Sequence, residues 1–217
     1  MLYIVSTPIG NLKDISLRAL EVLKEVDLIA CEDTRHTQKL LTHYQISKPL
    51  ISYFEHNEEK RSQELLAQLK NGKKIALVSD AGTPGVSDPG YRLIKASRDN
   101  DIPITVIPGA CAVIAALSLS GLPSNAFIFE GFLPVKAGGR RNKLLEFKNE
   151  RRTVIFYEST HRILKTLFDI QEVLDDPQIV CCREITKAFE EVKRGKASEV
   201  LAHFQTHPLK GEFVIVI

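Results

Sequence analysis

The sequence has few cysteines, and their spacing excludes the usual roles of that residue in small domains. The four cysteines stand at positions 31, 111, 181 and 182, without a C-x-x-C pair or a partnering histidine pattern. Neither a disulfide framework nor a zinc site is therefore expected, and no metal ligands are predicted. We expect isolated thiols in the core of a protein from a reducing compartment.

Long apolar runs are missing as well. No stretch reaches the roughly 18 apolar residues of a membrane-spanning helix, and the strand-like start LYIVS carries no basic leader. We therefore expect a soluble, cytoplasmic protein without membrane contacts. The net charge is only +2 in 217 residues, so composition alone indicates no nucleic acid partner.

Several nucleotide-binding and catalytic motifs are absent. The chain has no G-x-x-x-x-G-K-[ST] loop, and no G-x-G-x-x-G follows its first predicted strand. H-E-x-x-H and G-x-S-x-G do not occur either. The sequence thus does not predict a P-loop, a dinucleotide fold, a zinc protease or a serine hydrolase.

What the sequence does contain is an alternation of apolar strands and amphipathic helices. In the first half, strands are predicted at 2–6, 27–31, 50–53, 75–78 and 104–107. This order is typical of an α/β domain with a parallel sheet. The turn residues at 121–125 predict a boundary between an N-terminal α/β domain, residues 1–120, and a C-terminal α/β domain, residues 125–217.

The second half repeats the alternation around a basic segment. Residues 131–143 resemble a mobile connection, and residues 136–152 hold seven lysines and arginines against two glutamates, a local charge of +5. Contact with a polyanion and a solvated helix face both explain such a run. The last strand ends the sequence without a polar tail, which predicts a truncated or naturally shortened end.

Three loops rich in small residues follow predicted strands. They are TPIGNL at 7–12, VSDAGTPGVSDPG at 78–90 and PGACA at 108–112. Glycine permits close backbone approach and positive φ, while proline stiffens the turns. Loops at the carboxyl ends of strands commonly bind ligands. None of the three has a phosphate-cradling lysine, so the predicted ligand is held by backbone groups and is not a polyphosphate.

Further motifs extend this set along almost the whole chain. With EDTR at 32–35, FYES-x-HR at 156–162, REITK at 183–187 and GEF near the end, the loops resemble the tetrapyrrole methylase superfamily. Tetrapyrrole-modifying members share a D-x-G-x-P core, here Asp80, Gly82 and Pro84. EDTR and YES-x-HR resemble the branch that methylates ribosomal RNA. That branch continues past GEF into a small helical extension without a counterpart in this sequence.

The resemblance implies two α/β domains of the tetrapyrrole methylase type, with S-adenosylmethionine in the cleft between them, and a homodimer. It further implies 2′-O-methylation of a cytidine ribose in the decoding region of 16S rRNA, within the small ribosomal subunit. Two alternatives stay open. In the first, the chain is a methyltransferase for a small tetrapyrrole-like molecule. In the second, it is a non-catalytic module that binds the cofactor or RNA.

The matching motifs imply a set of cofactor contacts in both halves of the chain. The first half would contribute Pro8, Gly10, Asp80, Ala81, Gly82, Thr83, Pro84, Val86, Ser87, Pro108, Gly109 and Ala110. The second half would contribute Tyr157, Arg183, Glu184, Thr186, Gly211 and Glu212. Asp88, followed by Pro89, is predicted to cap the next helix.

Methylation of a ribose hydroxyl calls for a base or for a cation that stabilises the developing oxyanion. The candidate catalytic residues are Glu32, Asp33, Arg35 and Glu158, although Asp33 equally fits a helix cap. RNA contacts are predicted for Lys13, Arg35, Arg140, Arg141, Lys143, His161 and Arg162. Tyr53, Phe54 and Tyr157 are candidates for stacking on a splayed base, and core positions are the alternative.

Overall fold

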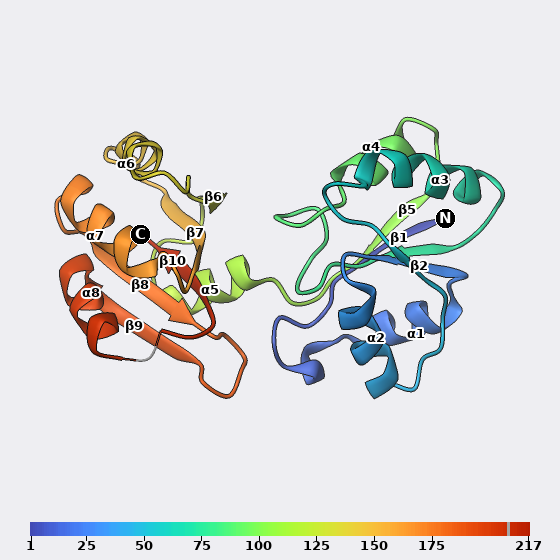
Figure 1. Cartoon of the computed structure of the whole chain (residues 1–217), viewed down its shortest axis with the longest axis horizontal. Helices are drawn as coiled ribbons and strands as arrows, with labels where there is room; N and C mark the ends of the chain where they lie inside the picture. Colours follow the sequence, from blue (N-terminus) through green and yellow to red (C-terminus); the bar gives the residue numbers. More distant parts are fainter. Residues whose placement is uncertain (208) are drawn as a thin grey trace. The chain divides into compact units, whose positions relative to one another are not determined.

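Residues 1–207 and 209–217 are described by the structure, a computed structural model. The chain forms two compact units, Met1–Cys111 and Ala112–Ile217, each with a five-stranded sheet (Figure 1). Both units are α/β, as predicted from the sequence. Within the described residues, no helix has the length and hydropathy needed to cross a membrane.

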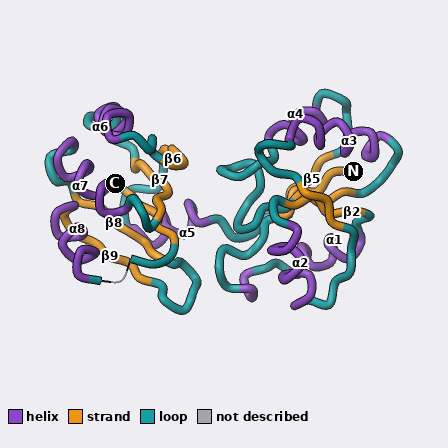
Figure 2. Tube along the Cα trace, viewed as in Figure 1, coloured by secondary structure: helices purple, strands orange, loops and turns teal. Residues whose placement is uncertain are grey.

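The first unit alternates strands and helices, as the apolar periodicity predicts. Its strands are parallel and lie in the order β3-β2-β4-β1-β5. Helices flank the orange strands in Figure 2. The elements are β1 (Leu2–Val5), a 3-10 helix (Leu12–Asp14), α1 (Leu17–Glu25), β2 (Leu28–Cys31), α2 (Thr34–His43), β3 (Leu50–Ser52), α3 (Glu58–Lys70), β4 (Ile75–Leu77), α4 (Tyr91–Arg98) and β5 (Ile104–Ile107).

Two hydrophobic clusters fix the helices on opposite faces of this sheet. Val5 packs in one cluster with Leu23 of α1, and Leu2 packs in the other with Leu65 and Leu93 of α3 and α4. Buried parallel strands read as continuous apolar runs because both faces are covered. Because β1 pairs in parallel with both β4 and β5, the carboxyl ends of these three strands lie at one edge of the sheet.

Local capping explains where two helices of the first unit begin. The Ser16 hydroxyl accepts a hydrogen bond from the backbone N–H of Ala19, and the Asp33 carboxylate accepts one from the backbone N–H of Arg35. The N-cap of α4 is Gly90 and not Asp88, so the predicted N-cap position is wrong by two residues.

The second unit has a mixed sheet in the order β6-β7-β10-β8-β9. Strands β6 and β7 are parallel, and the other neighbours are antiparallel. The final strand lies in the middle, so the last residues are paired as predicted. The elements are α5 (Ala112–Ser120), β6 (Phe127–Phe132), α6 (Ala137–Glu146), β7 (Thr153–Ser159), α7 (Ile163–Val173), β8 (Gln178–Arg183), β9 (Glu191–Lys196), α8 (Ala197–Thr206) and β10 (Glu212–Val216).

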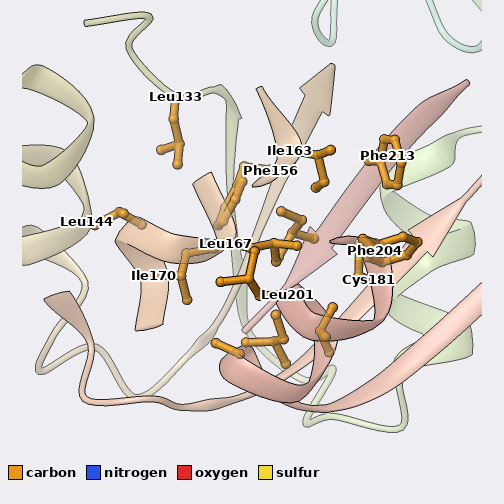
Figure 3. Packing of buried hydrophobic residues seen from close by; sticks show 14 of the residues in the cluster. Leu133, Leu144, Phe156, Ile163, Leu167, Ile170, Cys181, Leu201, Phe204 and Phe213 are labelled. Atoms are coloured by element: carbon orange, nitrogen blue, oxygen red, sulfur yellow. The ribbon is translucent and has the colours of Figure 1, made fainter. Parts of the chain in front are cut away.

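The core of this unit forms between its sheet and the helices α6, α7 and α8 (Figure 3). Phe156 and Phe213 come from neighbouring strands, and Leu167 and Phe204 come from α7 and α8. All four side chains are buried completely or almost so. The apolar stripe of α7, formed by Ile163, Leu167 and Ile170, therefore faces the core, as its helical spacing requires.

Two sequence predictions for chain organisation are wrong. The units divide between Cys111 and Ala112, one helix before the predicted boundary at 121–125, because α5 packs against β10 and β7 of the second sheet. The predicted mobile connection at 131–143 instead contains most of α6. Leu144, buried in the core, holds that helix in place despite its two glycines.

Candidate functional site

The three glycine- and proline-containing loops of the first unit meet at the carboxyl edge of its sheet. Thr7 and Gly82 exchange backbone hydrogen bonds of 2.9 and 3.1 Å, which joins the loop after β1 to the loop after β4. The Thr83 hydroxyl lies 2.9 Å from the Ser6 hydroxyl and donates to the carbonyl of Ala110 at 3.3 Å. Thr83 therefore connects all three loops.

Close backbone approach explains two of the glycines at this edge. Gly82 has φ +84°, a conformation that side-chain-bearing residues rarely adopt. A Cβ on Gly109 would stand 2.9 Å from the Cβ of Ser6, closer than packed carbons approach. Ser79 adds a further tie, because its carbonyl accepts from the Thr7 hydroxyl at 3.1 Å.

The sequence predicted most of the loop residues at this edge, but it did not predict the residues whose hydrogen bonds join the loops. Ser6, Thr7 and Ser79 join the loops, yet none was among the predicted cofactor contacts: Ser6 ends the first predicted strand, and Thr7 and Ser79 stand at the start of their loop motifs. Ser6 and Thr7 are almost fully buried. A small hydroxyl residue at a strand end next to a glycine loop is the only local signal that these positions offer.

The neighbouring strand end places two of the predicted catalytic residues beside Asp80. The backbone N–H of Asp33 donates to the Asp80 carboxylate at 3.0 Å, and the Glu32 carboxylate lies close enough to Asp80 to be affected by its charge. Burial, together with the nearby carboxylates of Asp80 and Asp88, raises the pKa of Glu32. Glu32 is half-buried.

Asp33 has a different environment. Its carboxylate binds the Arg35 guanidinium at 2.8 and 3.1 Å and the Arg35 backbone N–H at 2.8 Å. These bonds lower the pKa of Asp33 well below its usual range. Asp33 is thus a helix cap and an ion-pair partner, which was the structural alternative for this residue.

Glu158 is wrong as a catalytic candidate, because its side chain has no exposed surface. Its carboxylate pairs with Arg162 at 2.7 Å and accepts from the Thr166 hydroxyl at 2.6 Å. The backbone N–H of Ser159 completes the set at 2.7 Å. With all these partners in the core of the second unit, the carboxylate cannot reach a substrate.

Three of the predicted RNA contacts are also bound within the protein. The buried Arg140 pairs with the buried Asp169 at 2.6 Å, and Arg162 is held by Glu158. Lys143 pairs with Glu130 at 2.8 Å and with Glu146 at 2.9 Å. These predictions are wrong for Arg140 and Arg162, because a desolvated, paired guanidinium cannot leave its partner for phosphate without large cost.

The remaining predicted RNA contacts stay at the surface. Lys13 and His161 are exposed, and the Arg141 side chain is 45% exposed. The Arg35 side chain is 88% exposed even in its pair with Asp33. Among the aromatic candidates, Tyr53 is buried and unavailable for base stacking, whereas Phe54 is partly exposed.

In the second unit, the predicted cofactor residues gather at the ends of β8 and β10. The backbone N–H of Glu184 donates to the carbonyl of Glu212 at 3.0 Å, and Lys187 pairs with both carboxylates. Gly211 has φ +97°, and a Cβ there would collide with the Glu184 side chain. The residues of the REITK and GEF motifs are therefore in direct contact.

Thr186 in this cluster has an unusual environment. Its φ is +68°, and its hydroxyl oxygen is buried without a hydrogen-bond partner among the described residues. An orphaned hydroxyl is costly unless a ligand or water satisfies it. Tyr157, the other candidate of this unit, is partly exposed, and its ring meets Phe129 and Phe132 edge-on, with centroids 4.9 and 5.6 Å apart.

Comparison with known proteins places these motifs in one family. Residues 1–201 match the family model of the tetrapyrrole (corrin/porphyrin) methylases. The chain belongs to this family. The assignment agrees with the resemblance noted in the loop motifs, and it covers both α/β units.

Two curated relatives and one solved structure illustrate the similarity. The chain is 52% identical to a ribosomal RNA small subunit methyltransferase I of Synechocystis, covering 100% of this chain and 78% of the relative. Identity to the Thermotoga maritima protein of the same name is 49%, covering 100% and 97%. Uroporphyrin-III C-methyl transferase from Thermus thermophilus, complexed with S-adenyl homocysteine, matches with a TM-score of 0.67 at 18% identity, covering 99% and 96%.

The residues of the first unit fit the cofactor of a methyltransferase. The carbonyls of Ser79, Ala81, Gly82 and Ala110 and the hydroxyls of Ser6 and Thr83 lie together, and no lysine takes part in these contacts. Such a set suits a sulfonium cation with polar ribose and amino acid groups. It does not suit a polyphosphate, for which cationic side chains are the usual partners.

Proposed function

We propose that this chain is an S-adenosylmethionine-dependent methyltransferase whose substrate is small-subunit ribosomal RNA. The observation that carries the proposal is about 50% identity over the whole chain to proteins named for that activity. The edge formed by the three loops supports it. The finer assignment, the 2′-hydroxyl of a cytidine ribose in the decoding region, rests on the EDTR and YES-x-HR motifs.

The cofactor, when bound, supplies a methyl group on a sulfonium. In the first unit we assign its binding to the loop residues Asp80–Ser87, Pro108–Ala110 and Pro8–Gly10. Thr83 is the central member, because its hydroxyl already joins the loops. In the second unit, Thr186 and Gly211–Glu212 remain predicted contacts, supported by the orphaned hydroxyl of Thr186.

Among the candidate bases, we infer that Glu32 accepts the proton of the substrate hydroxyl. Asp33 is held by Arg35, and Glu158 is buried and paired. Glu32 lies beside Asp80, and burial together with the nearby carboxylates raises its pKa, which favours proton acceptance. Glu32 would take the proton of the substrate hydroxyl, and the donor, when bound, would supply the methyl group to that oxygen.

We infer a homodimer that works in the cytoplasm, where its RNA substrate is found. Helix α5 is mainly apolar, and Ile114 and Leu119 keep 49% and 43% of their surface exposed. A helix of this kind is normally covered on every side. Sedimentation of the purified protein tests this point, and a monomer at micromolar concentration would reject it.

The activity is tested with labelled S-adenosylmethionine and two kinds of acceptor. We expect transfer to small ribosomal subunits that lack the modification and none to porphyrinoid precursors, with the methyl group mapped to a ribose by mass spectrometry. Transfer to the porphyrinoid alone would favour the small-molecule alternative. Cofactor binding without transfer to any cellular RNA would favour the non-catalytic module.

A further inference from the structure

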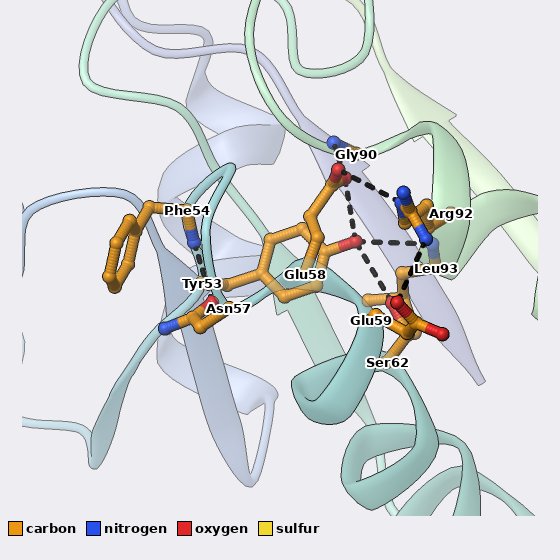
Figure 4. Close-up of polar contacts among 9 residues, drawn as sticks. All are labelled: Tyr53, Phe54, Asn57, Glu58, Glu59, Ser62, Gly90, Arg92 and Leu93. Atoms are coloured by element: carbon orange, nitrogen blue, oxygen red, sulfur yellow. Dashed lines mark hydrogen bonds and ion pairs between the residues drawn. The ribbon is translucent and has the colours of Figure 1, made fainter.

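The far end of the 78–90 loop is held by two side chains from the β3–α3 connection and the start of α3 (Figure 4). The Glu58 carboxylate accepts hydrogen bonds from the backbone N–H of Gly90 at 2.8 Å and from the Tyr53 hydroxyl at 2.9 Å. The Tyr53 oxygen in turn accepts from the backbone N–H of Leu93 at 3.2 Å and lies 3.1 Å from the Ser62 hydroxyl.

These contacts supply what the sequence of α4 itself lacks. Its N-cap is Gly90, which has no side chain to bind the free N–H groups of the first turn. Leu93 is the third residue of the helix, where an N-cap side chain usually binds. The Tyr53 hydroxyl occupies that place, and the Glu58 carboxylate lies at the positive end of the helix dipole.

Burial makes this anchor well defined. Tyr53 is only 1% exposed and the Glu58 side chain 12%. Burial also raises the pKa of the Tyr53 phenol, so that it keeps its proton for Glu58. Arg92 adds a looser ion pair to Glu58 at 3.8 Å. Hydrogen bonds in such a setting cost more to leave unmade than surface ones.

The loop is therefore tied at both ends, with an exposed arch between them. Residues 79–83 are bonded to Ser6 and Thr7, and Gly90 is bonded to Glu58. The arch at 85–87 is exposed, with Val86 at 47%. A Cβ on Gly90 would stand 3.0 Å from the backbone nitrogen of Gly85, so Gly90 also sets where the arch returns.

We propose that Tyr53 and Glu58 are positioning residues for the 78–90 loop. By fixing Gly90 and the first turn of α4, they hold this loop in the geometry that binds the cofactor. This proposal rests on the proposed function, because the arch at 85–87 is assigned to binding of the methyl donor. Neither side chain touches the cofactor in this account. Their effect reaches it through the backbone between Gly85 and Gly90.

The test compares Tyr53→Phe, Glu58→Ala and Glu58→Gln with Glu59→Gln as the matched control. Affinity for S-adenosylmethionine is measured by calorimetry, and amide hydrogen exchange is followed at 84–93. We expect Tyr53→Phe and Glu58→Ala to bind roughly tenfold more weakly, because the hydrogen bonds that each variant loses act on binding only through the loop backbone. We also expect faster exchange at 84–93. Glu59, 80% exposed, reaches only Arg92 at 3.6 Å, so the control binds like the wild type.

Glu58→Gln separates positioning from simple destabilisation. Its amide oxygen still accepts from Gly90 and Tyr53, so we expect affinity within about threefold of the wild type. Unchanged affinity of Tyr53→Phe and Glu58→Ala, with only a lower melting temperature, would overturn the inference. If Glu58→Ala does not fold, Tyr53→Phe decides, because it removes a single oxygen. A folded wild type without cofactor affinity would instead reject the proposed function.

Discussion

Glu32 and Asp33 are adjacent in the sequence, and their carboxylates have opposite electrostatic surroundings. Asp33 caps α2 and is held by Arg35, which keeps it ionised. Glu32 is half-buried beside Asp80, where ionisation is disfavoured. Of the two carboxylates, only that of Glu32 has a raised pKa, which is the direction of change that favours proton acceptance by a general base.

The first prediction concerns the pH dependence of methyl transfer. Burial and the carboxylates of Asp80 and Asp88 raise the pKa of Glu32, so transfer should fall as the pH drops through that raised value. Glu32→Gln should lose roughly 100-fold or more in kcat, the usual contribution of a general base, and retain cofactor affinity. Single-turnover assays across pH measure the pH dependence of transfer and the loss of rate in Glu32→Gln.

Asp33→Asn is the comparison for Glu32→Gln. An asparagine keeps the cap of α2, so kcat should stay near that of the wild type. A large loss in Asp33→Asn, with little in Glu32→Gln, would reverse the assignment of the base.

The second prediction concerns the buried pair of Arg140 and Asp169. Arg140→Ala leaves the Asp169 carboxylate buried without its closest cation and should lower the free energy of unfolding by about 3 to 5 kcal/mol. Arg141→Ala removes a guanidinium that is 45% exposed and 3.5 Å from Asp169, so it should cost less than about 1 kcal/mol. Urea unfolding measures both values, and equal losses would contradict the assigned roles.

At the scale of elements, the three loops form one unit because β1, β4 and β5 are neighbours in a parallel sheet. The motifs at 7–12, 78–90 and 108–112 were predicted from their glycines and prolines, and their meeting at one edge follows from strand direction. Strand order is a tertiary property. The sequence does not state that β1 lies between β4 and β5.

The third prediction uses two glycines with almost the same backbone conformation. Gly82 in the loop has φ +84°, and Gly72 after α3 has φ +85° with open space where a Cβ would stand. Alanine should strain the backbone by about 1 to 2 kcal/mol at either site. Only Gly82→Ala should also weaken S-adenosylmethionine binding, because its Cβ would meet Ile9 at 3.4 Å beside the tied loops. Thermal melting and calorimetry separate the two effects, and equal affinity in both variants would contradict a role of Gly82 in binding.

Helix α6 shows the limit of local pattern reading. Its sequence holds two glycines and a cluster of positive charge, which predicted a mobile connection. Leu144 in the core and the ion pair of Arg140 stabilise the helix instead. Both contacts are formed with α7 and the sheet, so no window of the sequence around α6 contains them.

For the whole molecule, the distribution of charge decides how RNA is bound. The local charge of +5 at 136–152 suggested a polyanion surface, but several of its cations are paired with Asp169, Glu130, Glu146 and Glu150. The total of +2 offers little long-range attraction. We therefore expect recognition by the shape of an assembled subunit more than by charge.

The fourth prediction follows for protein-free small-subunit RNA. With Lys13, Arg35 and Arg141 as the main phosphate contacts, the logarithm of affinity should fall with the logarithm of salt with a slope of about −2. Filter binding between low and physiological salt measures it. A slope of about −5 or steeper would mean that more cations bind RNA than the surviving predicted contacts.

The sequence by itself determined most of the strand and helix alternation, although not α6, together with the loop positions and the family, because periodicity, glycine and proline act locally. It also placed three of the four cysteines correctly in the core. Tertiary structure alone decided which charged residues are available. Arg140, Arg162 and Glu158 look the same in sequence as Arg35 and Glu32, and only packing removes the first three from solvent. The 78–90 loop likewise depends on Tyr53 and Glu58, whose contacts cross more than 30 residues of chain.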